Sequence, residues 1–328
     1  MERPRLAPDR KAEVVQGGLG VVRGVFLVSK DLGFRVLQKA LEIGGRDSIA
    51  GVVIVEDSAD RRSRYNETVR LCNDQPLPWW TDAQPKECYE EMVRTKADFL
   101  FVSGYYRVIP DEVIAKFPEG SYGIHHSLLP RYRGGSPLVW ALIRGDRVAG
   151  SSLFRLDGGI DSGPVVSRRK FEVPSNWTIA DATKRADDEA LDMFQLFFNN
   201  LRLHGTVHMT TQEEKDATYA AQRTDEDGQI SWEWPSDQVH DFVRAQTHPY
   251  PGAWTLDDKD RKLRVLSGAP VRDAWAARPG QVVRHSTEFV DVATGEGWAY
   301  RILRACYEGE GDPEGVPRAL QSRSRRLR

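Results

Sequence analysis

The sequence contains little cysteine. Only three cysteines occur among 328 residues, at Cys72, Cys88 and Cys306, and they lie far apart. This spacing matches neither a disulfide framework nor a cysteine-based metal site. We therefore expect a reducing compartment and no bound metal.

Long apolar runs and an excess of one charge are also missing. No apolar segment approaches the roughly 20 residues that a membrane-crossing helix needs, and residues 1–16 lack the apolar core of a signal peptide. The 46 Lys and Arg residues almost balance the 48 Asp and Glu residues, so the net charge is -2. Nucleic-acid binding usually calls for a basic surface. These absences predict a cytoplasmic protein that binds neither a membrane nor nucleic acid.

Strand and helix patterns alternate through the first two thirds of the chain. Short apolar runs at 24–30, 48–57 and 97–104 have the composition of buried strands, and helical patterns separate them. This alternation predicts an α/β fold with a doubly wound, mostly parallel sheet. An apolar stripe at helical spacing through 178–204 predicts a long helix that closes this domain.

The pattern changes after Gly205. A helix is expected at about 236–247, and short glycine-punctuated strands follow it, which predicts a small β-rich open barrel. We therefore divide the chain into four parts: a polar extension at 1–22, a catalytic domain at 23–205, a small C-terminal domain at 206–310, and a disordered tail at 311–328.

The segment from Gly123 to Gly163 carries most of the chemical information. It sets His125 at the carboxyl end of a predicted strand and places Asp161 in a glycine-rich turn 36 positions later. A histidine and a carboxylate that meet in one crevice of a sheet can perform general acid-base chemistry at a carbonyl. Taken singly, each has a plainer interpretation, as a buried structural histidine and as a turn-forming aspartate.

Two motifs in this segment resemble the formyltetrahydrofolate-dependent formyltransferase family. They are HHSLLPRYRG at 125–134 and DGGIDSG at 157–163. That family includes methionyl-tRNA, glycinamide ribonucleotide and sugar formyltransferases, together with the hydrolase domain of 10-formyltetrahydrofolate dehydrogenase. The resemblance implies that His125 and Asp161 are catalytic and that N10-formyltetrahydrofolate is the co-substrate.

Gly123 departs from the family pattern, which has asparagine at this position. Glycine cannot supply a side-chain amide to a developing oxyanion, and one such donor is worth ~2.7 to 4 kcal/mol. His126 is a poor substitute, because neighbouring side chains of a strand point to opposite faces. We expect a water molecule or a side chain from another loop to take this role, so that Gly123→Asn would lower the rate.

The resemblance also implies binding residues. For the folate these are Tyr105, Tyr106, Val108, Leu156, Asp157, Gly159 and Asp161, and for the acceptor they are Ser127, Arg133, Gly134, Arg61 and Arg62. Core packing is an alternative role for the two tyrosines. A solvated charge run is the alternative for Arg61, Arg62 and Arg64.

The predicted reaction is transfer of a formyl group to a small biosynthetic amine. The tyrosine pair and the RYRGGSPLVWAL segment resemble the formyltransferase domain that acts on UDP-4-amino-4-deoxy-arabinose, which favours a nucleotide-linked amino sugar. Several alternatives stay open: an amino acid-type amine such as hydroxyornithine, hydrolysis of formyltetrahydrofolate, methionyl-tRNA as acceptor, and a non-catalytic homologue. A homodimer is also left open.

Overall fold

The computed structural model describes residues 21–57, 60–310, 315–317, 320, 322 and 325–328. The expected extension at 1–22 falls almost entirely outside these residues, and so does half of the expected tail at 311–328. Of the described tail residues, Leu320 and Leu327 are buried in a hydrophobic core. The chain forms two compact units that are interleaved in sequence. The first unit comprises the chain through His125 with 151–169 and 188–217, and the second comprises 126–150, 170–187 and 218–328. The domain boundary at 206 stays a prediction.

A seven-stranded sheet has the order β3-β2-β1-β4-β5-β7-β8. The first five strands of this order pair in parallel, and β7 runs antiparallel to β5. The mostly parallel sheet predicted from the sequence is therefore confirmed. The strands are β1 (Gly24–Val28), β2 (Ile49–Ile54), β3 (Trp79–Thr81), β4 (Phe99–Ser103), β5 (Gly120–His125), β7 (Val148–Arg155) and β8 (Val165–Glu172).

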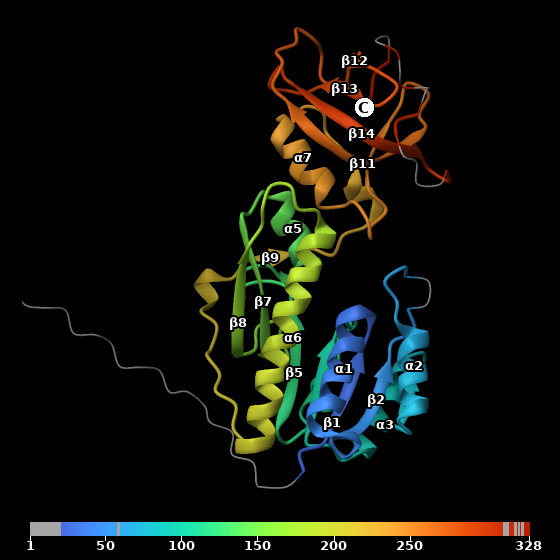
Figure 1. Ribbon diagram of the computed structural model, residues 1–328. Helices are drawn as coiled ribbons and strands as arrows, with labels where there is room; N and C mark the ends of the chain where they lie inside the picture. The colour runs from blue at the N-terminus through green and yellow to red at the C-terminus, as the bar shows by residue number, and fades with distance from the viewer. Residues whose placement is uncertain (1–20, 58–59, 311–314, 318–319, 321, 323–324) are drawn as a thin grey trace, which may run out of the picture. The chain divides into compact units, whose positions relative to one another are not determined.

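Helices cover both faces of the parallel strands. Buried side chains of α1 (Lys30–Gly44), α2 (Tyr65–Asp74) and α6 (Ile179–His204) share one core with β1, β2 and β4. Figure 1 shows α1 and α6 crossing the sheet. The opposite core contains α3 (Pro85–Arg94) and α4 (Asp111–Ile114). Continuous apolar strands are expected where a sheet is buried on both faces.

The second unit contains a five-stranded antiparallel sheet in the order β10-β11-β14-β13-β12. Helix α7 (Ser236–Arg244) packs Val239, Phe242 and Val243 into the core of this sheet. The predicted β-rich unit is thus present. Its elements also include α5 (Pro137–Ile143), β6 (Arg133–Gly134), β9 (Tyr219–Ala220), β10 (Ala253–Leu256), β11 (Lys262–Val271), β12 (Val282–His285), β13 (Val290–Ala293) and β14 (Ala299–Tyr307). Short 3-10 helices occupy Arg46–Ser48, Glu214–Asp216 and Asp225–Gly228.

Candidate active site

His125 is the last residue of β5, a strand held between β4 and β7. Its backbone lies opposite Ser152 of β7. The imidazole is largely buried, with 9% of the side chain exposed, and its ring meets the Phe154 ring nearly edge-on at a centroid distance of 6.4 Å. The histidine is therefore fixed by a rigid strand end rather than by a free loop.

Asp161 reaches His125 from the loop between β7 and β8. Because β7 is antiparallel to β5, it ends opposite Tyr122 rather than beside His125, and the loop carries the carboxylate back. Asp161 Oδ2 lies 3.4 Å from His125 Nδ1, and 24% of the Asp161 side chain is exposed. This distance exceeds that of a strong hydrogen bond, but contacts between catalytic groups are often long before substrate tightens them.

The backbone of Asp161 has φ 49°, in the left-handed region that residues other than glycine rarely occupy. Gln212 holds this conformation, since its Nε2 donates to the carbonyl oxygens of Asp161 at 2.8 Å and of Gly163 at 2.7 Å. A Cβ at Gly163 would collide with the carbonyl oxygen of Arg155, so the final glycine of the motif is a steric requirement. Strain maintained by surrounding contacts is typical of functional sites.

Gln212 was missed by the sequence reasoning. It lies 51 residues from Asp161, in the part of the chain after Gly205 where the sequence pattern changes, and it is buried, with 8% of its surface exposed. Nothing in its sequence neighbourhood marks it as a partner of the loop.

The space beside Gly123 is largely apolar. A Cβ built on Gly123 would lie 3.2 Å from Leu156 Cδ2, 3.5 Å from Phe154 Cε1 and 3.7 Å from the carbonyl oxygen of Val102. None of these three nearest atoms can donate a hydrogen bond. The immediate surroundings of a Cβ at this position are therefore two apolar side chains and a carbonyl oxygen.

Two loops of the first unit expose apolar side chains. Tyr106 is 64% exposed, Val108 89% and Ile160 63%, which places them among the most exposed large hydrophobic residues described. The loop that carries Ile160 adjoins the loop that carries Tyr106 and Val108. A Cβ at Gly158, in the former, would lie 2.5 Å from Oδ2 of Asp111, which directly follows the latter. Exposed apolar groups that gather in one place often mark a binding surface.

Tyr105 and Asp157 have structural roles in these loops. The Tyr105 hydroxyl lies 3.1 Å from that of Tyr89, and burial raises the pKa of the Tyr105 phenol. Asp157 Oδ1 accepts hydrogen bonds from Ser162 Oγ at 2.8 Å and from the Gly159 backbone at 3.1 Å. Both residues therefore shape the loops that carry the exposed apolar groups.

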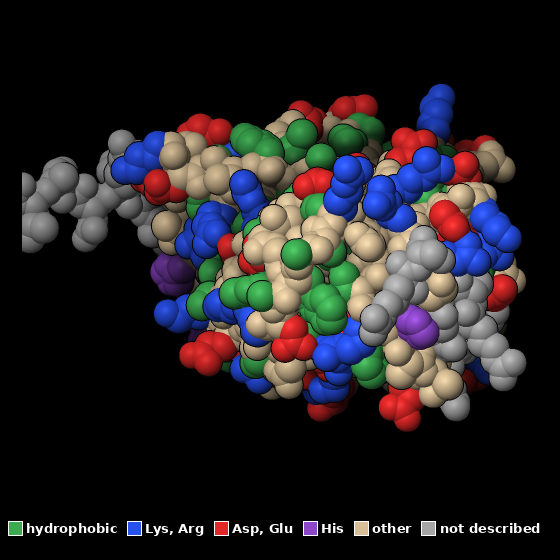
Figure 2. Space-filling model, turned by 90° about the horizontal axis from the view of Figure 1, so that it is seen from above, with side chains coloured by type: hydrophobic (Ala, Val, Ile, Leu, Met, Phe, Trp, Pro, Cys, Tyr) green, Lys and Arg blue, Asp and Glu red, His purple; other side chains and the backbone are tan. Residues whose placement is uncertain are grey.

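The predicted arginine run forms mainly local ion pairs. Arg62 pairs with Asp60 at 2.6 Å and lowers the pKa of that carboxyl to about 2. Arg64 lies 2.8 Å from Glu67, whereas Arg61 is exposed and makes no ion pair with the described residues. On the face drawn in Figure 2, Lys and Arg side chains are likewise mixed with Asp and Glu side chains.

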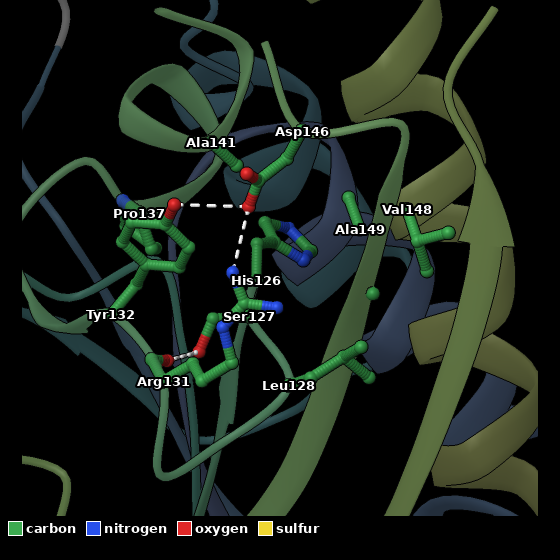
Figure 3. A pocket seen from close by; sticks show the side chains of 11 residues that line it. His126, Ser127, Leu128, Arg131, Tyr132, Pro137, Ala141, Asp146, Val148 and Ala149 are labelled. Atoms are coloured by element: carbon green, nitrogen blue, oxygen red, sulfur yellow. Dashed lines mark hydrogen bonds and ion pairs between the residues drawn. The ribbon is translucent and has the colours of Figure 1, made fainter. Parts of the chain in front are cut away.

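The segment that follows His125 is braced within the second unit (Figure 3). Ser127 Oγ donates to the Arg131 carbonyl at 2.6 Å, and Asp146 accepts from the Tyr132 hydroxyl at 2.9 Å. His126 Nε2 lies 3.0 Å from Asp187. The cavity lined by this segment has a volume of about 10 Å³, which holds roughly one water molecule. It is too small for a folate or an acceptor.

Arg133 and Gly134, predicted to bind the acceptor, form β6 in the same unit. The Arg133 side chain is buried, and its guanidinium donates to the Tyr219 hydroxyl at 3.2 Å. Gly134 has φ 99°, a conformation that favours glycine. These contacts give both residues a structural role in the loop.

Within the described ranges, no group of three or more His, Cys, Asp and Glu residues could hold a metal ion. Burial raises the pKa of the Cys72 thiol to about 12 and that of Cys88 to about 11, so neither is an activated nucleophile. None of the described helices combines the length and apolarity needed to cross a membrane.

Comparison with known proteins gives two family matches. Residues 23–196 match the formyl transferase model and residues 223–310 match the formyl transferase C-terminal domain model. Methionyl-tRNA formyltransferase of Sorangium cellulosum (strain So ce56) is 36% identical over 220 residues, which cover 65% of this chain and 68% of the relative.

Solved structures share the fold at lower identity. The N-formyltransferase from Helicobacter canadensis, in complex with folinic acid and dTDP-3-aminofucose, has a TM-score of 0.65 at 15% identity over 86% of this chain and 99% of its own. WlaRD, a sugar 3N-formyltransferase with dTDP and 5-N-formyl-THF, has a TM-score of 0.63 at 15% identity, covering 89% and 100%. HypX from Aquifex aeolicus, with tetrahydrofolic acid, has a TM-score of 0.62 at 20% identity; the match covers 92% of this chain but 46% of HypX.

Proposed function

Because the chain belongs to the formyl transferase family, we propose that it transfers a formyl group from N10-formyltetrahydrofolate to an amine. The contact between His125 and Asp161 at 3.4 Å carries this proposal. Formyl transfer needs an acid-base group beside the carbonyl, and the pair supplies one at the end of a rigid strand.

In the proposed reaction, the acceptor nitrogen forms a bond to the formyl carbon and the bond from that carbon to N10 breaks. The acceptor amine loses a proton and N10 gains one. Asp161 faces Nδ1 of His125, and we assign the movement of this proton to the imidazole ring. Asp161 keeps the imidazole oriented, and its exposed part can also accept a hydrogen bond from the amine.

The co-substrate has a flat pteridine and a p-aminobenzoyl group, and formyltetrahydrofolate supplies the activated formyl carbonyl. The exposed Tyr106, Val108 and Ile160 offer an apolar surface of suitable character on the loop that holds Asp161 and on the loop next to it. We propose this surface as the folate site. The folate compounds named for the solved relatives support a folate co-substrate.

We propose a nucleotide-linked amino sugar as the acceptor. The RYRGGSPLVWAL segment, the near-neutral net charge and the amino sugar nucleotide bound to the Helicobacter canadensis relative support this assignment. Arg61, exposed and without an ion pair to the described residues, is the candidate contact for the nucleotide phosphates.

Methionyl-tRNA is the second candidate acceptor, because the Sorangium cellulosum relative is 36% identical. A tRNA acceptor would benefit from an extended basic surface. The almost equal numbers of acidic and basic residues give this alternative less support.

The acceptor can be identified from the release of tetrahydrofolate. We expect release to rise at least tenfold when an amino sugar nucleotide is added, because the amine supplies the nucleophile and its binding excludes water. Parallel reactions would contain hydroxyornithine, methionyl-tRNA or no acceptor. Equal release without acceptor, with formate as product, would identify a hydrolase. Stimulation by methionyl-tRNA alone would replace the sugar proposal.

Asp161→Asn should lower kcat/KM at least tenfold while keeping the size of the side chain. The asparagine amide lacks the negative charge with which the Asp161 carboxylate stabilises a protonated His125. Ser162→Ala, which removes a neighbouring loop contact to Asp157, is the matched control. If Asp161→Asn retains more than about a tenth of the activity, the carboxylate has no role in proton movement.

A further inference from the structure

A second cavity lies in the first unit, away from the residues of the candidate active site. Its volume is about 480 Å³. Its walls come from β8, from the C-terminal half of α6 and from the segment that follows α6. The lining residues are Val166, Ser167, Arg169, Met193, Leu196, Phe197, Asn200, His204, Thr206, Val207 and His208.

The floor of this cavity is apolar. Met193, Phe197 and Val207 are at most 3% exposed and belong to the core that α6 shares with the sheet. Leu196 of the lining is 52% exposed on α6, and Leu203, which does not line the cavity, is 63% exposed further along this helix. These two leucines are seven positions apart and so lie on one face of the helix. An apolar face left open beside a cavity is characteristic of a binding site.

The polar part of the wall carries only basic titratable groups. Arg169, His204 and His208 line the cavity, and its lining contains no Asp or Glu. Within the described part of the chain none of these three forms an ion pair. By contrast, Arg35 on α1 pairs with Asp188 at 2.7 Å. Asp192 lies one turn before Leu196 on α6 but does not line the cavity.

We propose that this cavity binds a small amphipathic anion. The apolar body of the ligand lies on Met193, Phe197 and Val207, and its carboxylate, sulfonate or phosphate is held by Arg169 with support from His204 and His208. Guanidinium groups bind such oxyanions through two parallel hydrogen bonds. The volume lies within the range of about 300 to 1,000 Å³ that is usual for small-molecule sites.

The fluorescent anion 8-anilinonaphthalene-1-sulfonate combines an apolar body with one sulfonate and is a suitable probe. The full chain would be titrated with it and the bound probe competed with octanoate or octylammonium. We expect saturable binding that octanoate displaces and octylammonium does not. Folinic acid should leave the bound probe in place, because the proposed folate surface lies on other loops.

Substitutions in the cavity would show whether the probe binds there. Arg169→Ala should weaken probe binding at least fivefold, and Ser167→Trp, which fills the cavity, should abolish it. Arg168→Ala is the matched control, since Arg168 is exposed on the same strand but does not line the cavity. Thermal unfolding would verify that each variant is folded. Because the Arg169 side chain is exposed, its replacement should not unfold the protein.

The proposal would be overturned by an absence of saturable binding, by equal weakening in Arg168→Ala and Arg169→Ala, or by displacement of the probe by folinic acid. Equal displacement by octylammonium would show a merely apolar site and would reject the anion assignment. Probe binding that depends on protein concentration would identify an interface between copies instead.

Discussion

Replacing His125 with alanine is expected to lower kcat/KM for formyl transfer by at least about 100-fold. A positioned acid-base group contributes roughly 100-fold to 10,000-fold, and His125 is the imidazole whose Nδ1 faces Asp161. Steady-state kinetics with saturating folate would measure the effect. His125 is the last residue of β5, so the variant should remain folded, and thermal unfolding would verify this.

His126→Ala is the matched control for this prediction. His126 is adjacent in sequence, but its Nε2 lies 3.0 Å from Asp187. This variant should keep kcat/KM within about threefold of the parent. Equal losses in the two variants would point to a structural effect of the segment rather than to proton transfer. A His125→Ala enzyme with more than a tenth of the parent activity would exclude the histidine from the mechanism.

Local patterns in the sequence predict the regular elements well. The stripe at 178–204 matches α6 at Ile179–His204, because helical periodicity depends on neighbours within one or two turns. Strand β8 was not predicted, since Arg168, Arg169 and Lys170 are all exposed and interrupt the alternation of a half-buried strand. Strand β3 has three residues, too few for any periodicity.

Long-range features could not be predicted in the same way. The spacing of two motifs led to His125 and Asp161, but the antiparallel direction of β7 depends on strand pairing across the sheet. Gln212 stabilises the Asp161 loop only because the folded chain brings distant segments together. The interleaving of the two units likewise depends on packing that no local pattern encodes.

The sequence also left open what replaces the missing amide at Gly123, and the structure alters the expected result of Gly123→Asn. From the sequence we expected a lower rate, on the assumption that another group fills the space. The three nearest atoms, however, belong to Leu156, Phe154 and a carbonyl, and none can donate a hydrogen bond. Leu156 is only partly buried, so the end of its side chain can move by the few tenths of an ångström that a Cβ requires.

We therefore expect Gly123→Asn to raise kcat, by up to ~100-fold if the amide reaches the developing oxyanion. Its donor is worth ~2.7 to 4 kcal/mol, whereas crowding in a packed site costs about 1 to 3 kcal/mol, so the donor term should dominate. Gly123→Leu is the control, because it adds the same number of side-chain heavy atoms without a donor and should lower the rate. Single-turnover measurements on both variants would separate chemistry from product release. A fall in both would show that crowding, or displacement of a group already bound beside Gly123, outweighs the added donor. A rise with asparagine alone would show that the parent enzyme works with an incomplete oxyanion site.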